Sequence, residues 1–183
     1  MVDDMANDQL IKNAQAGNRS AFEALINAHY LTIYKFAYKF IGNRPDAEDI
    51  AQDACMKLAA NIDSFRFDSA FTTWLYRLVI NTAKDFIKKK SRHQSRESAL
   101  FEDAIYVAAP DNQEKQFSQR EVLKQVDDLP EKLRDVVILV CWEGLSHAEA
   151  ATILDIKENT VSWRLHEVRK IMNDTFNKEA HHG

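Results

Sequence analysis

Residues that interrupt regular backbone structure are scarce in this chain, which holds four glycines and three prolines among 183 residues. β-Sandwiches and β-barrels need many tight turns, and glycine and proline are the residues that most often form them. Helical bundles need few such turns. Hydrophobic residues make up 45% of the chain, which is enough to build a core. The sequence therefore predicts an all-α protein.

The sequence lacks the segments and motifs that mark several other classes of protein. No apolar run approaches the roughly 20 residues of a membrane-spanning helix, and the acidic N-terminus lacks the pattern of a secretory signal. We therefore expect a cytoplasmic protein without membrane insertion. Gly-rich phosphate loops, zinc-protease motifs and nucleophile elbows are missing as well. We accordingly expect no catalytic residue, no cofactor and no metal.

The two cysteines and the isolated histidines give only weak signals. Cys55 and Cys141 lie in apolar helical stretches, so we expect both to be small core residues. A regulatory disulfide between them is the alternative. His29 and His147 are expected at the surface or at helix ends rather than as ligands.

Capping signals divide the N-terminal half of the chain into helices. Ser20 begins a capping box that predicts a helix over 20–41, and Gly42 suits the left-handed position after its last residue. Pro45 suits the first turn of a second helix, predicted over 45–61. The remaining helices are predicted over 70–92, 120–129, 131–143, 146–155 and 159–176.

The stretch 91–117 differs from the rest of the chain in its weak periodicity and polar composition. More than about 15 residues without clear structure in a small protein are typical of a linker. The sequence therefore predicts two small helical domains, 1–92 and 118–183, joined by a flexible linker at 93–117.

The last two predicted helices have the pattern of a helix-turn-helix. In the second of them an apolar stripe recurs at i, i+4, i+7 and i+11, which places it on one buried side. This stripe consists of Val161, Leu165, Val168 and Met172. The opposite side shows Asn159, Ser162, Trp163, His166 and Lys170. In a DNA-binding helix-turn-helix such a side enters the major groove. A plain helical hairpin with a polar outer face is the alternative.

The helix predicted over 70–92 also has two distinct faces. Its inner face is formed by Phe71, Leu75, Leu78, Val79, Thr82 and Phe86. Its outer face repeats Arg77, Asn81, Lys84 and Lys88 at helical spacing, with Trp74 beside them. Cationic groups attract phosphates, and an adjacent aromatic ring can stack on unpaired bases. The alternative is a solvated face whose Trp74 packs into the core.

The helix that follows Pro45 carries a polar, acidic face. Asp49, Gln52, Asp53 and Met56 lie on this face, while Ile50, Ala54, Leu58 and Ile62 lie on the other. Acidic groups with one exposed methionine suit a basic protein partner better than DNA. An ordinary solvated helix face is the alternative.

Three long segments resemble motifs of one known family. They are DAEDIAQDACMKL at 46–58, DSFRFDSAFTTWLYRLVINTAKDFI at 63–87 and LPEKLRDVVILVCWEGLSHAEAATILDIKENTVSWRL at 129–165. In that order they resemble the polymerase-binding motif, the −10 recognition segment and the −35 recognition domain of the extracytoplasmic-function (ECF) sigma factors. The likeness is to the sigma-E-like branch.

The resemblance implies a sigma-2 domain that binds the β′ clamp helices of core RNA polymerase and −10 promoter DNA. It implies a sigma-4 domain that binds the β flap and −35 DNA. The implied polymerase contacts are Asp49, Gln52 and Asp53, and Met56 joins them on the same face. The implied −10 contacts are Asp63, Ser64, Phe65, Arg66, Phe67, Trp74, Arg77, Asn81, Lys84 and Lys88. The implied −35 contacts are Asn159, Thr160, Ser162, Trp163, Arg164, His166, Arg169 and Lys170.

The chain departs from the family pattern at several of these positions. Phe67 stands where the family usually has glycine, in the loop that would hold a base pulled out of the stack. Asn159 replaces another glycine, and Ser162 and Glu167 stand where basic residues are common. Between Ser118 and Gly183 the chain has nine Lys and Arg against twelve Asp and Glu.

The expected function is that of an alternative sigma factor, which binds core polymerase, recognises promoter DNA and promotes strand opening. The expected partners are core RNA polymerase, promoter DNA and an anti-sigma factor. The alternative is a sigma-like adaptor that mainly binds an anti-sigma factor or another regulator through the same surfaces. The acidic recognition helix, predicted over 159–176, supports this alternative.

Overall fold

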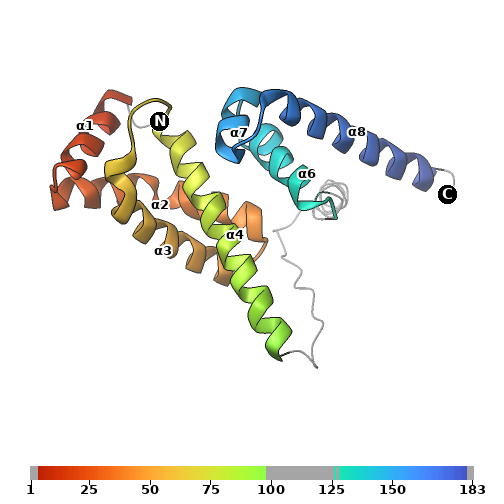
Figure 1. Cartoon of the computed structure of the whole chain (residues 1–183), viewed down its shortest axis with the longest axis horizontal. Helices are drawn as coiled ribbons and strands as arrows, with labels where there is room; N and C mark the ends of the chain where they lie inside the picture. The colour runs from red at the N-terminus through yellow and green to blue at the C-terminus, as the bar shows by residue number, and fades with distance from the viewer. Residues whose placement is uncertain (1–3, 98–125, 127, 181–183) are drawn as a thin grey trace, which may run out of the picture. The chain divides into compact units, whose positions relative to one another are not determined.

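The computed structural model describes residues 4–97, 126 and 128–180, and all regular structure within these ranges is helical (Figure 1). This confirms the predicted all-α class. Contacts divide the chain into two compact units, 1–107 and 108–183, called unit 1 and unit 2 below. Most of the predicted linker 93–117 and of the predicted helix 120–129 lies outside the described residues. The predicted domain bounds therefore remain predictions.

Unit 1 is a bundle in which α2, α3 and α4 all pack on one another. Its elements are α1 (Asp4–Gln15), α2 (Arg19–Ile41), α3 (Arg44–Asn61), the 3₁₀ turn η1 (Ile62–Ser64) and α4 (Phe71–Glu97). The shorter α1 packs on α2 and also reaches η1, so it lies at the end of the bundle where α4 begins (Figure 1). Residues buried completely between these helices include Ile11, Leu25, Ile33, Ile50, Leu58, Leu75 and Val79.

The helix ends in unit 1 follow their capping residues. Helix α2 begins at Arg19, because the side chain of Asn18 accepts a hydrogen bond from the backbone N–H of Ala21 at 3.1 Å. The predicted capping box at Ser20 is therefore wrong. Gly42 ends α2 in the left-handed region with φ 77°, as predicted. Pro45 lies in the first turn of α3, again as predicted.

Two features of unit 1 differ from the sequence-based expectations. Helix α1 was not predicted, because its apolar stripe is limited to Leu10, Ile11 and Ala14. Helix α4 continues to Glu97 instead of ending at 92, because no glycine or proline interrupts it there.

Unit 2 contains α6 (Glu131–Val136), the π-helical turn η2 (Val137–Trp142), α7 (His147–Leu154) and α8 (Glu158–Ala180). Ser146 and Glu149 form the predicted capping box in full, with each side chain bonded to the backbone of the other residue. Asp155 takes the left-handed conformation with φ 56° in the turn between α7 and α8, which aspartate tolerates. One hydrophobic cluster in the core of unit 2 joins Val126, Leu129, Val137 and Val168 with Leu133, Trp142 and Met172.

The segment predicted as one helix over 131–143 changes its winding partway. The backbone N–H of Glu143 bonds to the carbonyl of Ile138 at 3.0 Å, which is the five-residue step of a π turn. Val136, Val137, Ile138 and Leu139 are all buried here. Four consecutive apolar residues give no helical period, so the sequence pattern did not show where the winding would change.

Candidate functional site

The acidic face predicted on α3 is present. Asp49 and Gln52 are exposed, Asp53 is half-buried, and the Met56 side chain is 64% exposed. The residues predicted for the opposite side of α3 are all buried in the bundle, namely Ile50, Ala54, Leu58 and Ile62. The predicted separation of the two faces is confirmed, whereas the predicted partner of the acidic face remains a prediction.

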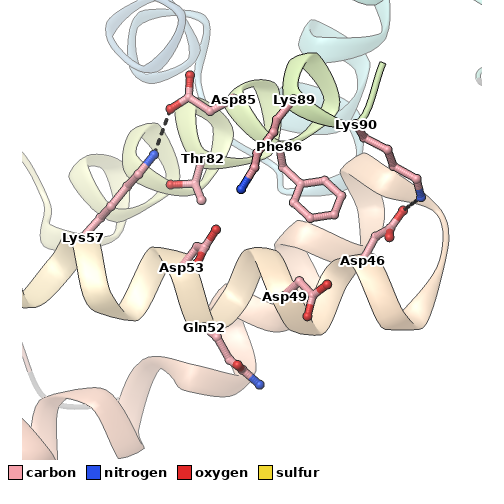
Figure 2. Close-up of a pocket in the computed structure, with 10 residues that line it drawn as sticks. All are labelled: Asp46, Asp49, Gln52, Asp53, Lys57, Thr82, Asp85, Phe86, Lys89 and Lys90. Carbon is pink, nitrogen blue, oxygen red and sulfur yellow. Dashed lines mark hydrogen bonds and ion pairs between the residues drawn. The ribbon is translucent and has the colours of Figure 1, made fainter. Parts of the chain in front are cut away.

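A groove of about 530 Å³ runs between this face of α3 and helix α4 (Figure 2). Lysines and carboxylates bridge it at both ends. Lys90 donates to the Asp46 carboxylate at 2.6 Å, and Lys57 donates to the Asp85 carboxylate at 2.9 Å. Burial raises the pKa of Asp46, but hydrogen bonds from Lys90 and Asn43 and the charge of Lys90 outweigh it, so this pKa lies below 3.8.

Two acidic residues of the groove differ from Asp46 and Asp85. Within the described part of the chain, neither Asp49 nor Asp53 forms an ion pair. In Figure 2, Asp53 points into the groove and Gln52 points away from α4. Lys89 of α4 also lines the groove and points toward this face in Figure 2, but within the described residues it forms no ion pair with Asp49 or Asp53. The acidic face of α3 therefore keeps two carboxylates outside the ion pairs with α4, and these suit a basic partner.

The basic stripe predicted on α4 lies at the surface. Arg77, Asn81 and Lys88 are exposed and Lys84 is half-buried. The predicted inner face is confirmed, since Phe71, Leu75, Val79 and Thr82 are buried and Leu78 and Phe86 are half-buried. Helix α4 therefore presents a line of cationic and amide groups on one side and packs against the bundle with the other.

Trp74 combines features of the two interpretations considered for it. The indole is half-buried, and its ring centre lies 5.7 Å from that of Phe65 and 5.8 Å from that of Phe71. The ring is thus held in place by aromatic neighbours at the start of α4, beside the loop that leads into this helix. A fixed aromatic ring next to a basic stripe is the arrangement that binds unstacked bases.

Turn η1 and the loop that leads from it to α4 present polar side chains above aromatic rings. Asp63 and Ser64 of η1 and Arg66 of the loop are exposed. Phe65, predicted among the DNA contacts, is only 4% exposed, so the structure places its ring in the core instead of on the loop surface. Phe67 is half-buried and has φ 60°, a left-handed conformation that favours glycine.

Helix α1 supports this loop through contacts that the sequence did not predict. The Nε2 group of Gln15 donates to the carbonyl oxygens of Ile62 and Phe65, both at 2.9 Å. The ammonium group of Lys12 lies 5.4 Å from the centre of the Phe67 ring. These residues are 47 to 55 positions apart in sequence, so no local pattern could reveal the contacts.

The helix-turn-helix in unit 2 has the predicted faces. Val161, Leu165 and Val168 are buried and Met172 is half-buried. Trp163 is 59% exposed, which confirms the exposure predicted from helical geometry. The other exposed residues of the predicted −35 set are Asn159, Ser162, His166, Arg169 and Lys170, while Thr160 and Arg164 are half-buried.

Polar contacts connect α8 to other elements of unit 2. The His147 ring nitrogen Nδ1 and the Ser162 hydroxyl are 2.9 Å apart, which connects the first turn of α7 to the first turns of α8. Arg164 donates to the backbone carbonyl of Lys132 at 3.4 Å. Ser162 and Arg164, both predicted to contact DNA, therefore also help to position α8.

Two sequence-based expectations about single residues are wrong. His29 is 5% exposed, its Nε2 lies 2.9 Å from Oδ1 of Asn7, and its ring packs edge-on against Phe71. This burial lowers the pKa of His29 below 6.5. Cys141 is exposed rather than part of the core, because it lies on the outer side of η2. Cys55 is half-buried, and burial raises the pKa of its thiol.

Within the described ranges of the chain, no three or more His, Cys, Asp or Glu side chains form a cluster suited to hold a metal ion. None of the helices in these ranges has the length and apolar character needed to cross a bilayer.

Comparison with known proteins gives matches across both units. The family Sigma-70 region 2 matches residues 25–93, and the family Sigma-70, region 4 matches residues 119–172. An ECF RNA polymerase sigma-E factor of Haemophilus influenzae is 30% identical over 95% of this chain and 97% of its own length. The ECF RNA polymerase sigma factor SigW of Bacillus subtilis is 32% identical over 88% of this chain and 92% of its own.

A solved structure shows the same fold. It is the sigma factor RpoE of Bartonella quintana in complex with the anti-sigma factor NepR. The match has a TM-score of 0.70, covers 85% of this chain and 96% of that chain, and has 24% sequence identity. The expected order of two sigma domains is thereby confirmed.

Proposed function

The chain belongs to the ECF sigma factors of RNA polymerase, and we propose a division of labour between its two units in transcription initiation. Unit 1 binds core polymerase through α3 and captures the opened −10 element through α4 and the η1–α4 loop. Unit 2 binds the β flap and the −35 element through its helix-turn-helix. The protein is not an enzyme, requires no cofactor and acts in the cytoplasm, where bacterial transcription takes place.

One observation carries this proposal for unit 1. The exposed basic stripe of α4 lies on the same helix as Trp74, whose ring is fixed beside the η1–α4 loop. Opening duplex DNA costs about 1.4 kcal/mol per base-pair step in lost stacking. Stacking of a released base on an aromatic ring contributes about 1–3 kcal/mol. The two magnitudes are comparable, so binding of the displaced strand can favour the open state without a catalytic group.

The polymerase contact is proposed for the acidic face of α3. Asp49 and Asp53 form no ion pair within the described residues, and Met56 presents an exposed, adaptable apolar surface next to them. With Gln52 they form a polar and acidic surface that complements a basic helical partner. We assign this surface to the β′ clamp helices.

The −35 contact is proposed for the exposed side of α8. Unit 2 has little cationic charge, so we assign part of its affinity to Trp163, whose indole can contact thymine methyl groups or sugars in the major groove. Arg169 and Lys170 lie further along the same helix, where they can reach flanking phosphates.

We also propose that an anti-sigma factor binds this protein, because a structure with the same fold contains one. The alternative, an adaptor that does not itself drive transcription, is supported by the acidic composition of unit 2. Both readings predict binding of a regulator, but only a sigma factor supports promoter-directed synthesis.

Run-off transcription on a library of genomic fragments, with core polymerase and this protein, tests the proposal. We expect transcripts that start at discrete sites sharing −10 and −35 sequences, and that are absent when either protein is omitted. If the protein binds core polymerase but yields no specific transcript from any fragment, the adaptor reading replaces the proposed function.

A further inference from the structure

We propose that Gln15 is a positioning residue for strand capture, and that α1 acts through it to hold the η1–α4 loop in its binding conformation. This inference rests on the proposed function of unit 1. None of the residues assigned to DNA binding lies in α1, so the helix would act on DNA recognition through the loop rather than by direct contact.

The two hydrogen bonds of Gln15 are the first line of evidence. An amide NH₂ group has two hydrogens and can serve two acceptors at once. Gln15 Nε2 donates to the carbonyls of Ile62 and Phe65, both at 2.9 Å, from a part-buried position. The same turn is closed by a bond from the Phe65 N–H to the Ile62 carbonyl at 3.1 Å. A single side chain thus fixes the spacing of both ends of η1.

The place of these bonds in the loop explains what they position. Ile62 and Phe65 are buried, while Asp63 and Ser64 between them and Arg66 after them are exposed. The exposed side chains project from backbone that Gln15 holds. The amide of Gln15 therefore fixes the backbone that carries the polar groups assigned to the captured base, and its two hydrogen bonds involve none of those side chains.

Phe67 supplies a second contact between α1 and the loop. Its left-handed backbone, with φ 60°, is unfavourable in a residue that has a side chain. The ring lies between the Phe65 ring, 4.8 Å away, and the Lys12 ammonium, 5.4 Å away. Lys12 and Gln15 are three residues apart, so they lie on the same face of α1. One helix face therefore supports both the turn and the strained residue beyond it.

Helix α1 is itself held firmly. Ile11 is fully buried, and Asn7 Oδ1 lies 2.9 Å from the buried His29 of α2. Helix α2 in turn packs on α4. The loop is thus supported from a rigid element on one side and continues into α4 on the other, which keeps its bound conformation in place before DNA arrives.

The test compares two isosteric variants of the full-length chain, each assembled with core polymerase. In Gln15→Glu the ionised carboxylate keeps the shape of the amide but has no donor, and it repels the two carbonyls. Gln9→Glu is the matched control, because it makes the same change on the same helix at an exposed residue that bonds only to Asn13. The probe is the single-stranded, fluorescein-labelled −10 segment of a promoter found by the run-off selection.

We expect Gln15→Glu to weaken binding of this single strand about tenfold, as the loss of two hydrogen bonds implies. Affinity for core polymerase should stay unchanged, and Gln9→Glu should behave as wild type. Gln15→Lys, which restores a donor, should recover most of the affinity. A base analogue such as 2-aminopurine, placed at each position of the strand, should show a smaller fluorescence change with Gln15→Glu at the captured base.

Single-strand affinity of Gln15→Glu equal to that of Gln9→Glu would overturn the inference. If Gln15→Glu unfolds, Gln15→Met takes its place, because it removes the donor without adding charge. Weakened single-strand binding would again support the inference, and affinity equal to that of Gln9→Glu would again overturn it. Single-strand binding by the wild-type protein distinguishes failure of the proposed function from failure of the role of Gln15. If wild type itself does not bind the single strand, the proposed function of unit 1 fails. If wild type binds and the Gln15 variants bind equally well, only the role of Gln15 fails.

Discussion

The two units bear different charge although both are assigned to DNA. Between Phe71 and Arg92, the helix assigned to the −10 element has six Lys and Arg against one acidic residue. Between Glu158 and Asp174, the helix assigned to the −35 element has three of each. On the proposed assignments, unit 1 would bind a strand through phosphates and ring stacking, whereas unit 2 would depend more on shape and on Trp163. The proposal thus has one protein bind DNA through two chemically different surfaces.

The difference has a direct consequence for salt dependence. Each neutralised phosphate releases counterions, so affinity falls more steeply with salt when more cationic contacts are made. Binding by unit 1 should therefore be more sensitive to ionic strength than binding by unit 2. The following predictions test this contrast, beginning with the largest expected effect.

Reversing one charge on the acidic face of α3 should have the largest effect. Asp53→Lys should weaken binding to core polymerase by about 30-fold or more, because like charges then face each other at the interface. Asp8→Lys, an exposed residue of α1, makes the same change away from this face and should have no effect. A pull-down titration measures both. Core affinity of Asp53→Lys within error of wild type would remove the assignment of this face.

Substitutions on α4 should impair strand opening more than duplex binding. Asn81 is exposed, so Asn81→Ala should leave the fold intact. Trp74→Ala should lower open-complex formation about tenfold through lost stacking, and it should also lower thermal stability because Trp74 packs on Phe65 and Phe71. Permanganate footprinting measures the open complex. Footprints of wild-type strength in Asn81→Ala and Trp74→Ala would contradict the role of this stripe.

Truncation of the exposed indole in unit 2 should have a smaller effect. Trp163→Ala should reduce transcription about fivefold on a promoter with an intact −35 element, corresponding to about 1 kcal/mol of lost contact. The reduction should disappear on a promoter whose −35 element is scrambled, since the contact is then absent in both proteins. Equal activity of variant and wild type on the intact promoter would show that Trp163 serves another partner.

The smallest predicted effect is a difference in how mild acid changes the stability of the two units. Burial lowers the pKa of His29 below 6.5, so the folded state favours the neutral ring. The stability from this group is present above pH 6.5 and is lost as the pH falls below it. Hydrogen bonds from Ser146 lower the pKa of Glu149 in unit 2, and that contribution is lost only below about pH 4.5.

Thermal melts monitored by circular dichroism between pH 7.5 and 5.5 measure this difference. The wild-type transition of unit 1 should shift to lower temperature as the pH falls, and the shift should be smaller in His29→Gln, which does not titrate. An identical shift in the two proteins would show that His29 does not cause it.

The faces of the helices could be predicted from the sequence because they depend on local spacing. The burial of Ile50, Ala54 and Leu58 and the exposure of Trp163 both follow from the helical period. The cap at Ser146 was likewise visible, because its partner is three residues away.

The contacts that position the site could not be predicted in this way. Gln15 bonds to Ile62 and Phe65 across almost 50 residues of chain, and the burial of His29 depends on Asn7 in a helix that the sequence did not reveal. Phe67 marks an intermediate case. The resemblance to the family implied that it stands where glycine is usual, but only the backbone angle shows that it adopts the conformation that glycine favours.

The placement of the three tryptophans makes the protein its own spectroscopic probe. Trp74 lies in the aromatic cluster beside the η1–α4 loop, Trp142 packs against the core of unit 2, and Trp163 is exposed to water. Emission from an exposed indole lies at longer wavelength than emission from a packed one, and a soluble quencher reaches it first. Acrylamide quenching of the unlabelled protein would thus follow contact at α8 through Trp163, and in a Trp142→Phe variant changes at the blue edge would follow events at the loop. The binding steps of the two units can then be timed separately in one sample.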